Sequence, residues 1–289
     1  MSPRILHIGP KFKSMSIPVR KKRVSVPDIR ACKGGEPLVC LTAYTAPIAS
    51  ILNDRVDVLL VGDSLGMVVY GMDDTLAVTL DMMIAHGRAV VRAATTAFIV
   101  VDLPFGSYEA SPEQAFHAAA HVMSKTGCQA VKLEGGVEMT DTITFLTARG
   151  IPVMAHIGLM PQSFNTTGGF RAQGLSDETA TQIEADGAAV EQAGAFSVVV
   201  EGTSEPVARR LTENLTIPTI GIGASPACDG QILVTDDVLG LFSSFKPRFV
   251  KRFGDIGDAV AMAADAYAEE VKARKFPTLD HCYGVKKES

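Results

Sequence analysis

Charged residues stand at the ends of several short apolar runs in this chain. The stretch VDVLLVGDSLG (56–66) ends its apolar run at Gly62 and continues with Asp63, and AFIVVDLPFG (97–106) leads in the same way to Asp102. The runs AVKLEGG, PVMAHIG and FSVVVEG repeat the arrangement with Lys132 and Glu134, His156, and Glu201. A buried carboxylate costs several kcal/mol unless it is paired or bound to a metal. Any single aspartate here could form a structural ion pair, but six such residues indicate one shared site.

The residue types narrow the chemistry of that site. Carboxylates without a histidine or cysteine cluster favour a hard divalent cation, and Mg²⁺ is the leading candidate. Asp63 and Asp102 are the first candidates for its ligands, with Glu134 reaching the ion directly or through water. Lys132 precedes Glu134 by two residues, so both side chains share one face of a strand; the lysine could neutralise the carboxylates, bind an anionic substrate or serve only as a salt bridge. Glu201, on a distant run, is free to act as a general base.

The elements that must position these residues alternate along the chain. Continuous aliphatic strands indicate burial on both faces, as in a parallel sheet covered by helices. Helical spacing is clear over 79–94, 112–126 and 177–193, and Ser111, Pro112 and Gln114 form a helix start. Eight strands alternating with helices predict a (β/α)8 TIM barrel in a single domain, whose strands all open at their carboxyl ends onto the active-site face; an open doubly wound sheet is the alternative. The predicted strands are 38–43, 56–62, 97–102, 130–134, 153–156, 196–201, 219–223 and 248–251.

Composition sets limits on the class of protein. The formal net charge of −5 gives no reason to expect nucleic acid as a partner. The five cysteines are scattered without a C-x-x-C pair, which is typical of reduced thiols in the cytoplasm. No apolar run reaches the roughly 18 residues of a membrane span, so no membrane partner is expected. Residues 1–24 are basic and contain three prolines, which predicts a disordered arm, with a transit peptide as the alternative; residues 25–289 are expected to form the barrel domain.

Several motifs in one order give the chain a resemblance to a known family. LTAYTAPIASIL, GDSLGMVVYG, VDLPFGSYE, AVKLEGG, GLMPQSFNTTGGFRAQG and IPTIGIGASPACDGQILVTDDVLGL closely resemble ketopantoate hydroxymethyltransferases over about residues 25–275. The resemblance implies a (β/α)8 barrel, Mg²⁺, 3-methyl-2-oxobutanoate as the keto acid substrate and 5,10-methylenetetrahydrofolate as the one-carbon donor. It also implies the first committed step of pantothenate biosynthesis and a homo-oligomer, often a decamer.

The resemblance also assigns roles residue by residue. Asp63 and Asp102 match magnesium-binding aspartates, and Glu134 of KLEGG matches a third metal-associated carboxylate. Ser64 corresponds to a residue that holds the keto acid's carboxylate, and Glu201 of VVVEG matches the family's catalytic base, which would remove the C3 proton of the keto acid. The substrate-binding set implied in this way is Asp63, Ser64, Asp102, Lys132 and His156.

Two other functions stay open at this stage, and three positions depart from the family pattern. A Mg²⁺-dependent C–C or C–P lyase of the phosphoenolpyruvate mutase and isocitrate lyase type would share the barrel and the keto acid chelation, and a non-catalytic barrel is a further alternative. Thr45 stands where many relatives have Asp, Ser225 replaces a common glycine, and Leu175 replaces an arginine. Leu175 could alter loop closure, and Ser225 could add bulk near the barrel mouth.

Overall fold

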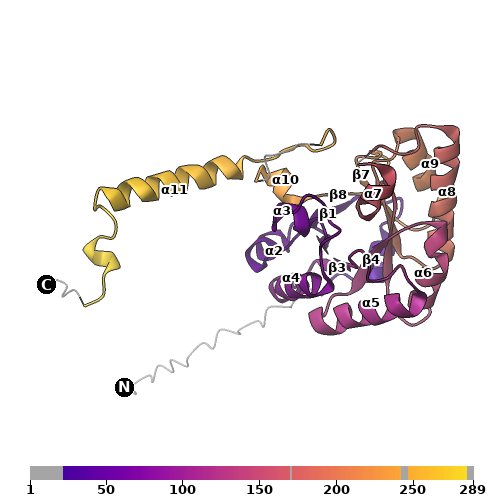
Figure 1. Ribbon diagram of the computed structural model, residues 1–289, viewed down its shortest axis with the longest axis horizontal. Helices are drawn as coiled ribbons and strands as arrows, with labels where there is room; N and C mark the ends of the chain where they lie inside the picture. The colour runs from indigo at the N-terminus through magenta and orange to yellow at the C-terminus, as the bar shows by residue number, and fades with distance from the viewer. Residues whose placement is uncertain (1–21, 170, 242–246, 285–289) are drawn as a thin grey trace, which may run out of the picture.

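The chain folds into a closed barrel of eight parallel strands with helices on its outside (Figure 1). A computed structural model describes residues 22–169, 171–241 and 247–284; the predicted N-terminal arm lies outside them except for its last three residues. The strands pair in chain order, and β8 pairs with β1 to close the barrel. This confirms the predicted (β/α)8 architecture. The strands are β1 (Leu38–Thr42), β2 (Val58–Val61), β3 (Phe98–Asp102), β4 (Ala130–Glu134), β5 (Val153–Gly158), β6 (Ser197–Glu201), β7 (Thr219–Ile222) and β8 (Gly230–Leu233).

The helices begin and end where their sequence signals lie. At α5 the Ser111 hydroxyl accepts a hydrogen bond from the Gln114 backbone N–H at 3.1 Å, and Gly127 ends the helix in the left-handed conformation. The longer helices are α4 (Leu80–Ala93), α5 (Pro112–Thr126), α6 (Thr140–Thr147), α8 (Asp177–Gln192), α9 (Glu205–Asn214) and α11 (Ile256–Lys272). Short helices lie at α1 (Val26–Ala31), α2 (Ala46–Leu52), α3 (Leu65–Val68), η1 (Val137–Met139), η2 (Pro161–Ser163), α7 (Phe164–Thr167), α10 (Thr235–Leu239) and η3 (Leu279–His281).

The predicted eighth strand was wrong. Residues 248–251 form no strand, and Gly230–Leu233 pairs with both β1 and β7 instead. The observed strand β8 begins with Gly230 and Gln231, and glycine is depleted in strands. Gly230 is required there, because a Cβ atom at this position would lie 2.8 Å from the Cβ and the carbonyl oxygen of Leu38. The close approach of β8 to β1 therefore hides the closing strand from a search for aliphatic runs.

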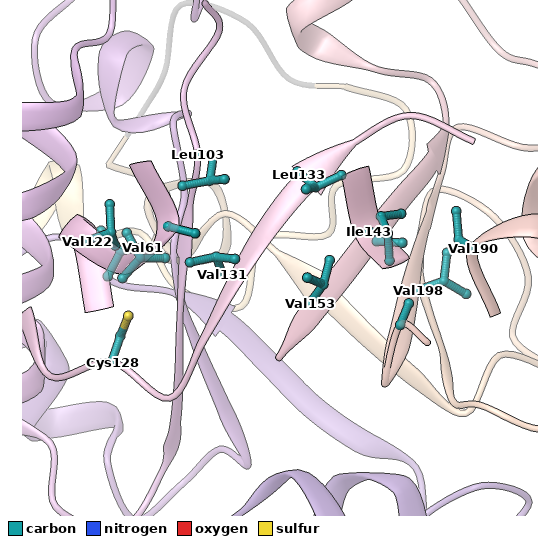
Figure 2. Close-up of a cluster of buried hydrophobic side chains, with 14 of the residues drawn as sticks. Val61, Leu103, Val122, Cys128, Val131, Leu133, Ile143, Val153, Val190 and Val198 are labelled. Carbon is teal, nitrogen blue, oxygen red and sulfur yellow. The ribbon is translucent and has the colours of Figure 1, made fainter. Parts of the chain in front are cut away.

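Two apolar layers hold the barrel together. The outer layer packs the outward side chains of the strands against the helices; Figure 2 shows part of it, with Leu133 and Val153 beside Ile143 of α6, and Val198 beside Val190 of α8. The inner layer fills the barrel itself. There the Phe98 and Phe196 rings meet edge to face, with 5.5 Å between their centroids, and Ile29 of α1 belongs to the same cluster. Burial on both faces of β2 to β7 is the reason that these strands read as continuous aliphatic runs.

Asp229 closes the amino-terminal end of the barrel. Its carboxylate accepts hydrogen bonds from the backbone N–H groups of Thr219 at 2.8 Å and Gly34 at 2.9 Å, and it pairs with Lys33 Nζ at 2.9 Å. Burial would raise the pKa of Asp229, but these donors outweigh it and hold the pKa below its usual range. The carboxylate therefore ties β7 to the segment that leads into β1.

We expect Asp229→Asn to lower the free energy of unfolding by about 2–3 kcal/mol at neutral pH, because two backbone donors and Lys33 lose a charged acceptor. A lowered pKa contributes stability that is present above the unfolded value and lost as pH falls through the folded value. The difference between wild type and variant should therefore be complete at pH 6 and shrink below about pH 4. Urea unfolding at several pH values measures it, and a difference that does not depend on pH would contradict the assignment.

The C-terminal helix α11 extends away from the barrel (Figure 1). None of its residues is buried, and Ile256, Val260, Tyr267 and Val271 lie exposed at spacings of 4, 7 and 4 along it. Residues at these spacings share one helix face. The face is apolar, and within the described part of the chain Phe276 packs on it, with its ring centroid 5.7 Å from that of Tyr267.

Candidate active site at the carboxyl ends of the strands

Strand alternation places the charged residues directly above the inner apolar layer. On β3 the side chains of Phe98, Val100 and Asp102 point inward in turn, and on β4 Lys132 and Glu134 follow Ala130 in the same way. The parallel register sets Asp102 beside Lys132. It also sets Glu134 beside His156, and Gly158 beside Glu201. The barrel therefore changes from apolar to charged within two residues of its mouth.

Asp63 and Asp102 lie next to each other. The backbone N–H of Asp63 donates to Asp102 Oδ2 at 3.1 Å, and both side chains are buried. A Cβ atom at Gly62 would lie 2.8 Å from Ser64 Oγ, so a side chain there would displace the Ser64 hydroxyl, which lines the cavity beside Asp63.

Lys132 and His156 are the basic groups of the site. Lys132 Nζ lies 3.1 Å from Asp102 Oδ1 and 3.3 Å from His156 Nδ1. His156 Nδ1 lies 3.3 Å from Glu134 Oε1, and His156 Nε2 lies 3.3 Å from Glu201 Oε2. His156 therefore links the carboxylate on β4 to the carboxylate on β6. Glu201 has the most exposed side chain of this group, at 17%, and faces the cavity.

The protonation of these groups follows from burial and mutual charge. Burial, then the charges of Asp102 and Glu134, raise the pKa of Asp63 to about 7, and burial also raises the pKa of Asp102. Burial would lower the pKa of Lys132, but the attraction of Asp102 and its neighbours outweighs this and raises it. Burial and Lys132 would lower the pKa of His156, yet the carboxylates of Glu134 and Glu201, each 3.3 Å from the ring, raise it to about 9. Both basic groups are therefore charged at neutral pH.

A cavity of 1190 Å³ opens over these residues. It is lined by Asp63, Ser64, Asp102, Lys132, Glu134, His156 and Glu201, together with apolar residues of the loops after β7 and β8. Ser64 Oγ lies 2.8 Å from the Tyr44 hydroxyl, which fixes the serine beside Asp63. Every residue predicted for the site thus lies on one cavity, which is large by the standard of small-molecule sites, about 300–1,000 Å³.

Two residues that the sequence did not reveal connect the acidic groups. Gln162 Nε2 donates to Asp63 Oδ2 at 2.8 Å, and the Gln162 backbone N–H donates to Glu134 Oε2 at 3.0 Å. The Tyr108 hydroxyl bonds to Gln162 Oε1 at 2.6 Å and accepts from the Glu134 backbone N–H at 3.2 Å. Both residues lie within the quoted motifs VDLPFGSYE and GLMPQSFNTTGGFRAQG, but nothing in their spacing predicts contact with Asp63 or Glu134.

The donor set fits a hard divalent cation. Asp102 Oδ1 and Glu134 Oε1 are buried and make no aligned hydrogen bond, although each lies within ion-pair distance of a basic group. Four acidic side chains face two basic ones, so the site is short of positive charge. In the described residues no three acidic, histidine or cysteine side chains converge into a ready cation cage. Mg²⁺ does not need one, because it binds through one or two carboxylates, waters and substrate oxygens.

Of the three departures from the family pattern, Ser225 lies at the site. The Ser225 hydroxyl, which lines the cavity, donates to Glu205 Oε1 at 2.8 Å and accepts from the Ala227 backbone N–H at 3.0 Å, so it braces the loop after β7. Leu175 is 76% exposed, and Thr45 is an exposed N-cap residue whose side chain makes no cap hydrogen bond. Neither of these two contacts the acidic groups.

Comparison with known proteins identifies the family of the chain. The family model for ketopantoate hydroxymethyltransferase matches residues 23–279. The chain belongs to the ketopantoate hydroxymethyltransferase family. It is 64% identical over 273 residues to the 3-methyl-2-oxobutanoate hydroxymethyltransferase of Paramagnetospirillum magneticum, covering 94% of this chain and 100% of that one. It is 59% identical to the enzyme of the same name from Sinorhizobium fredii, with the same coverage.

Solved structures of low sequence identity resemble this family member in fold only. A phosphonopyruvate hydrolase superposes with a TM-score of 0.58 at 13% identity, covering 91% of this chain and 92% of that one. A 2,3-dimethylmalate lyase of the PEP mutase/isocitrate lyase superfamily superposes with a TM-score of 0.55 at 18% identity, covering 92% and 91%. Both identities are too low to transfer a reaction.

Proposed function

We propose that this enzyme transfers a hydroxymethyl group from 5,10-methylenetetrahydrofolate to 3-methyl-2-oxobutanoate, giving ketopantoate as the first step of pantothenate biosynthesis. The observation that carries the proposal is the single cavity that joins the buried acidic groups to Glu201, in a chain 64% identical to a relative of that name. The cavity is wider than a small keto acid requires, which suits a second, larger co-substrate. The lyase alternative rests on fold likeness only.

The residues of the site can divide the reaction between them. Asp63 and Asp102 would hold Mg²⁺, with Glu134 beside it, and the bound ion would act as a Lewis acid on the oxygens of the keto acid. Ser64 and Lys132 would bind the carboxylate of the keto acid, Ser64 as a hydroxyl donor and Lys132 as a buried cation. His156 Nε2 lies 3.3 Å from Glu201 Oε2 and would hold the Glu201 carboxylate in position.

Glu201 would act as the general base. It takes the proton from C3 of the keto acid, and that carbon then forms a bond to the methylene carbon of the folate while one of the two carbon–nitrogen bonds to this methylene breaks and the freed nitrogen takes up a proton. Cleavage of the remaining carbon–nitrogen bond with one molecule of water leaves ketopantoate and tetrahydrofolate. The Glu201 side chain is partly exposed at the cavity wall, which gives its carboxylate access to substrate, whereas the other acidic side chains are buried.

The direct test supplies 3-methyl-2-oxobutanoate, 5,10-methylenetetrahydrofolate and Mg²⁺ and measures ketopantoate by mass spectrometry. We expect product only when all three are present, and its loss when a chelator is added. Cleavage of a lyase substrate without transfer from the folate would favour the alternative reaction. Binding of Mg²⁺ and keto acid with no turnover would favour a non-catalytic barrel.

We further propose that the enzyme is a cytoplasmic homo-oligomer, a decamer by family resemblance. The exposed apolar face of α11, where Val260 is 57% and Tyr267 60% exposed, supports association with further copies of the chain. No helix in the described residues combines the length and apolarity needed to cross a bilayer. Light scattering of wild type and of Val260→Asp/Tyr267→Asp should show a large assembly that the double variant reduces; a wild-type monomer would refute the proposal.

A further inference from the structure

Gln162 lies where the segment after β5 meets the acidic groups. It belongs to η2, a short 3₁₀ turn three residues beyond the end of β5, and it is 6% exposed. Its side chain reaches Asp63, which follows β2, while its backbone N–H reaches Glu134 on β4. One residue thus contacts two of the three acidic side chains assigned to the cation, at the ends of the strands that flank β3.

The partners of Gln162 fix which way its amide points. Its nitrogen faces the Leu103 carbonyl oxygen at 3.0 Å, which only accepts hydrogen bonds, and Asp63 Oδ2 at 2.8 Å, which accepts in the charged form. Its oxygen therefore faces the Tyr108 hydroxyl at 2.6 Å. Because that hydroxyl also accepts the Glu134 backbone N–H at 3.2 Å, its own proton is given to Gln162. The direction of every bond in the network is set.

These hydrogen bonds form a ring that begins and ends at Glu134, with a branch from Gln162 to Asp63. The Glu134 N–H donates to Tyr108, Tyr108 donates to the Gln162 amide oxygen, and the two N–H groups of Gln162 donate to Asp63 and Glu134. Each carboxylate has one oxygen held by Gln162, Asp63 through Oδ2 and Glu134 through Oε2. The other oxygen of Glu134 makes no hydrogen bond. Such fixed partners orient cation ligands and raise cation affinity.

We propose that Gln162 is a positioning residue that holds Asp63 and Glu134 for the cation and thereby couples the order of the segment after β5 to cation binding. This proposal rests on the cation site proposed above. Coupling of this kind is reciprocal: if the ordered segment strengthens cation binding, the bound cation must stabilise the ordered segment by the same free energy. The segment of 158–174 contributes part of the cavity wall through Leu159, Pro161 and Ala172, so its order bears on substrate access.

The test replaces Gln162 by Met, which keeps the length of the side chain and removes both polar groups. We expect the dissociation constant of Mg²⁺, measured calorimetrically without substrate, to rise about 10- to 100-fold. In wild type, Mg²⁺ should slow amide hydrogen exchange of the peptide 159–169, and in Gln162→Met this protection should be lost at matched saturation. Tyr108→Phe, which removes the donor to the Gln162 amide oxygen and the acceptor of the Glu134 backbone N–H, should weaken Mg²⁺ binding in the same direction and serves if Gln162→Met does not fold.

A matched control separates positioning from general damage to the segment. Gln173 lies in the same segment, but among the described residues its side chain bonds to the Arg171 carbonyl oxygen and not to an acidic group of the site. Gln173→Met should leave Mg²⁺ affinity and exchange protection unchanged. If Gln162→Met and Tyr108→Phe both bind Mg²⁺ as wild type does, the positioning role is refuted and the cation site stands. If wild type itself binds no Mg²⁺, the cation site and this inference fail together.

Discussion

Replacing Glu201 by glutamine should lower turnover by about 100- to 10,000-fold while the folded barrel is retained. Glutamine keeps the size of the side chain but cannot take up a proton. The side chain is 17% exposed at the cavity wall and lies 3.3 Å from His156 Nε2, so little packing depends on its charge. The Michaelis constant for the keto acid should change little, because the carboxylate of the substrate is expected to bind at Ser64 and Lys132.

Two measurements distinguish a base from a binding residue at this position. Steady-state assays with both substrates and Mg²⁺ give the fall in kcat, and exchange of the C3 hydrogen of 3-methyl-2-oxobutanoate with deuterated water gives the proton transfer alone. Both should fall together in Glu201→Gln. Glu184→Gln is the control, since Glu184 forms a surface ion pair with Arg210 at 2.7 Å. Full C3 exchange in Glu201→Gln would remove Glu201 from the proposed role.

The position of the site could be predicted because the fold converts strand ends into neighbours. Asp102 and Lys132 lie 30 residues apart in the sequence, yet the parallel register of β3 and β4 sets them side by side. The same rule brings Glu134 beside His156. Once the aliphatic runs predicted a parallel barrel, the residues at their ends had to share one mouth. The distances among them then follow from strand pairing, which depends on backbone geometry more than on side-chain detail.

The parts that could not be predicted depend on side-chain reach outside the strands. Gln162 contacts Asp63 from a position 99 residues away, through a turn whose path no periodicity describes. Tyr108 joins it from the loop after β3. The strand β8 was missed because Gly230 and Gln231 replace aliphatic residues where backbones approach closely. The outward course of α11 was also not predicted, because its apolar stripe is the same pattern that a helix packed on the barrel would show.

Asp63→Asn should have opposite effects on binding and on stability. Loss of a cation ligand should weaken Mg²⁺ binding at least as much as loss of a residue that only positions a ligand. We therefore expect Mg²⁺ affinity to fall on the order of 100-fold or more, with activity falling accordingly. The metal-free protein, in contrast, should become more stable at alkaline pH. Burial and the charges of Asp102 and Glu134 raise the pKa of Asp63 from 3.8 to about 7, so the folded protein disfavours the charged form.

The sign of the pH dependence follows from that raised pKa. The stability that Asp63 contributes is complete below about pH 4, where it is protonated in both states, and is lost as pH rises through about 7. Asparagine does not titrate, so in EDTA the variant should be more stable than wild type at pH 8.5, on the order of 1–2 kcal/mol, and closer to it at pH 5. Urea unfolding at both pH values measures the difference, with Asp265→Asn on the exposed face of α11 as the control. A variant that is less stable than wild type at pH 8.5 would show that the charged Asp63 carboxylate stabilises the fold. It would contradict the view that the acidic groups at the barrel mouth destabilise the metal-free protein and that a bound cation removes this destabilisation.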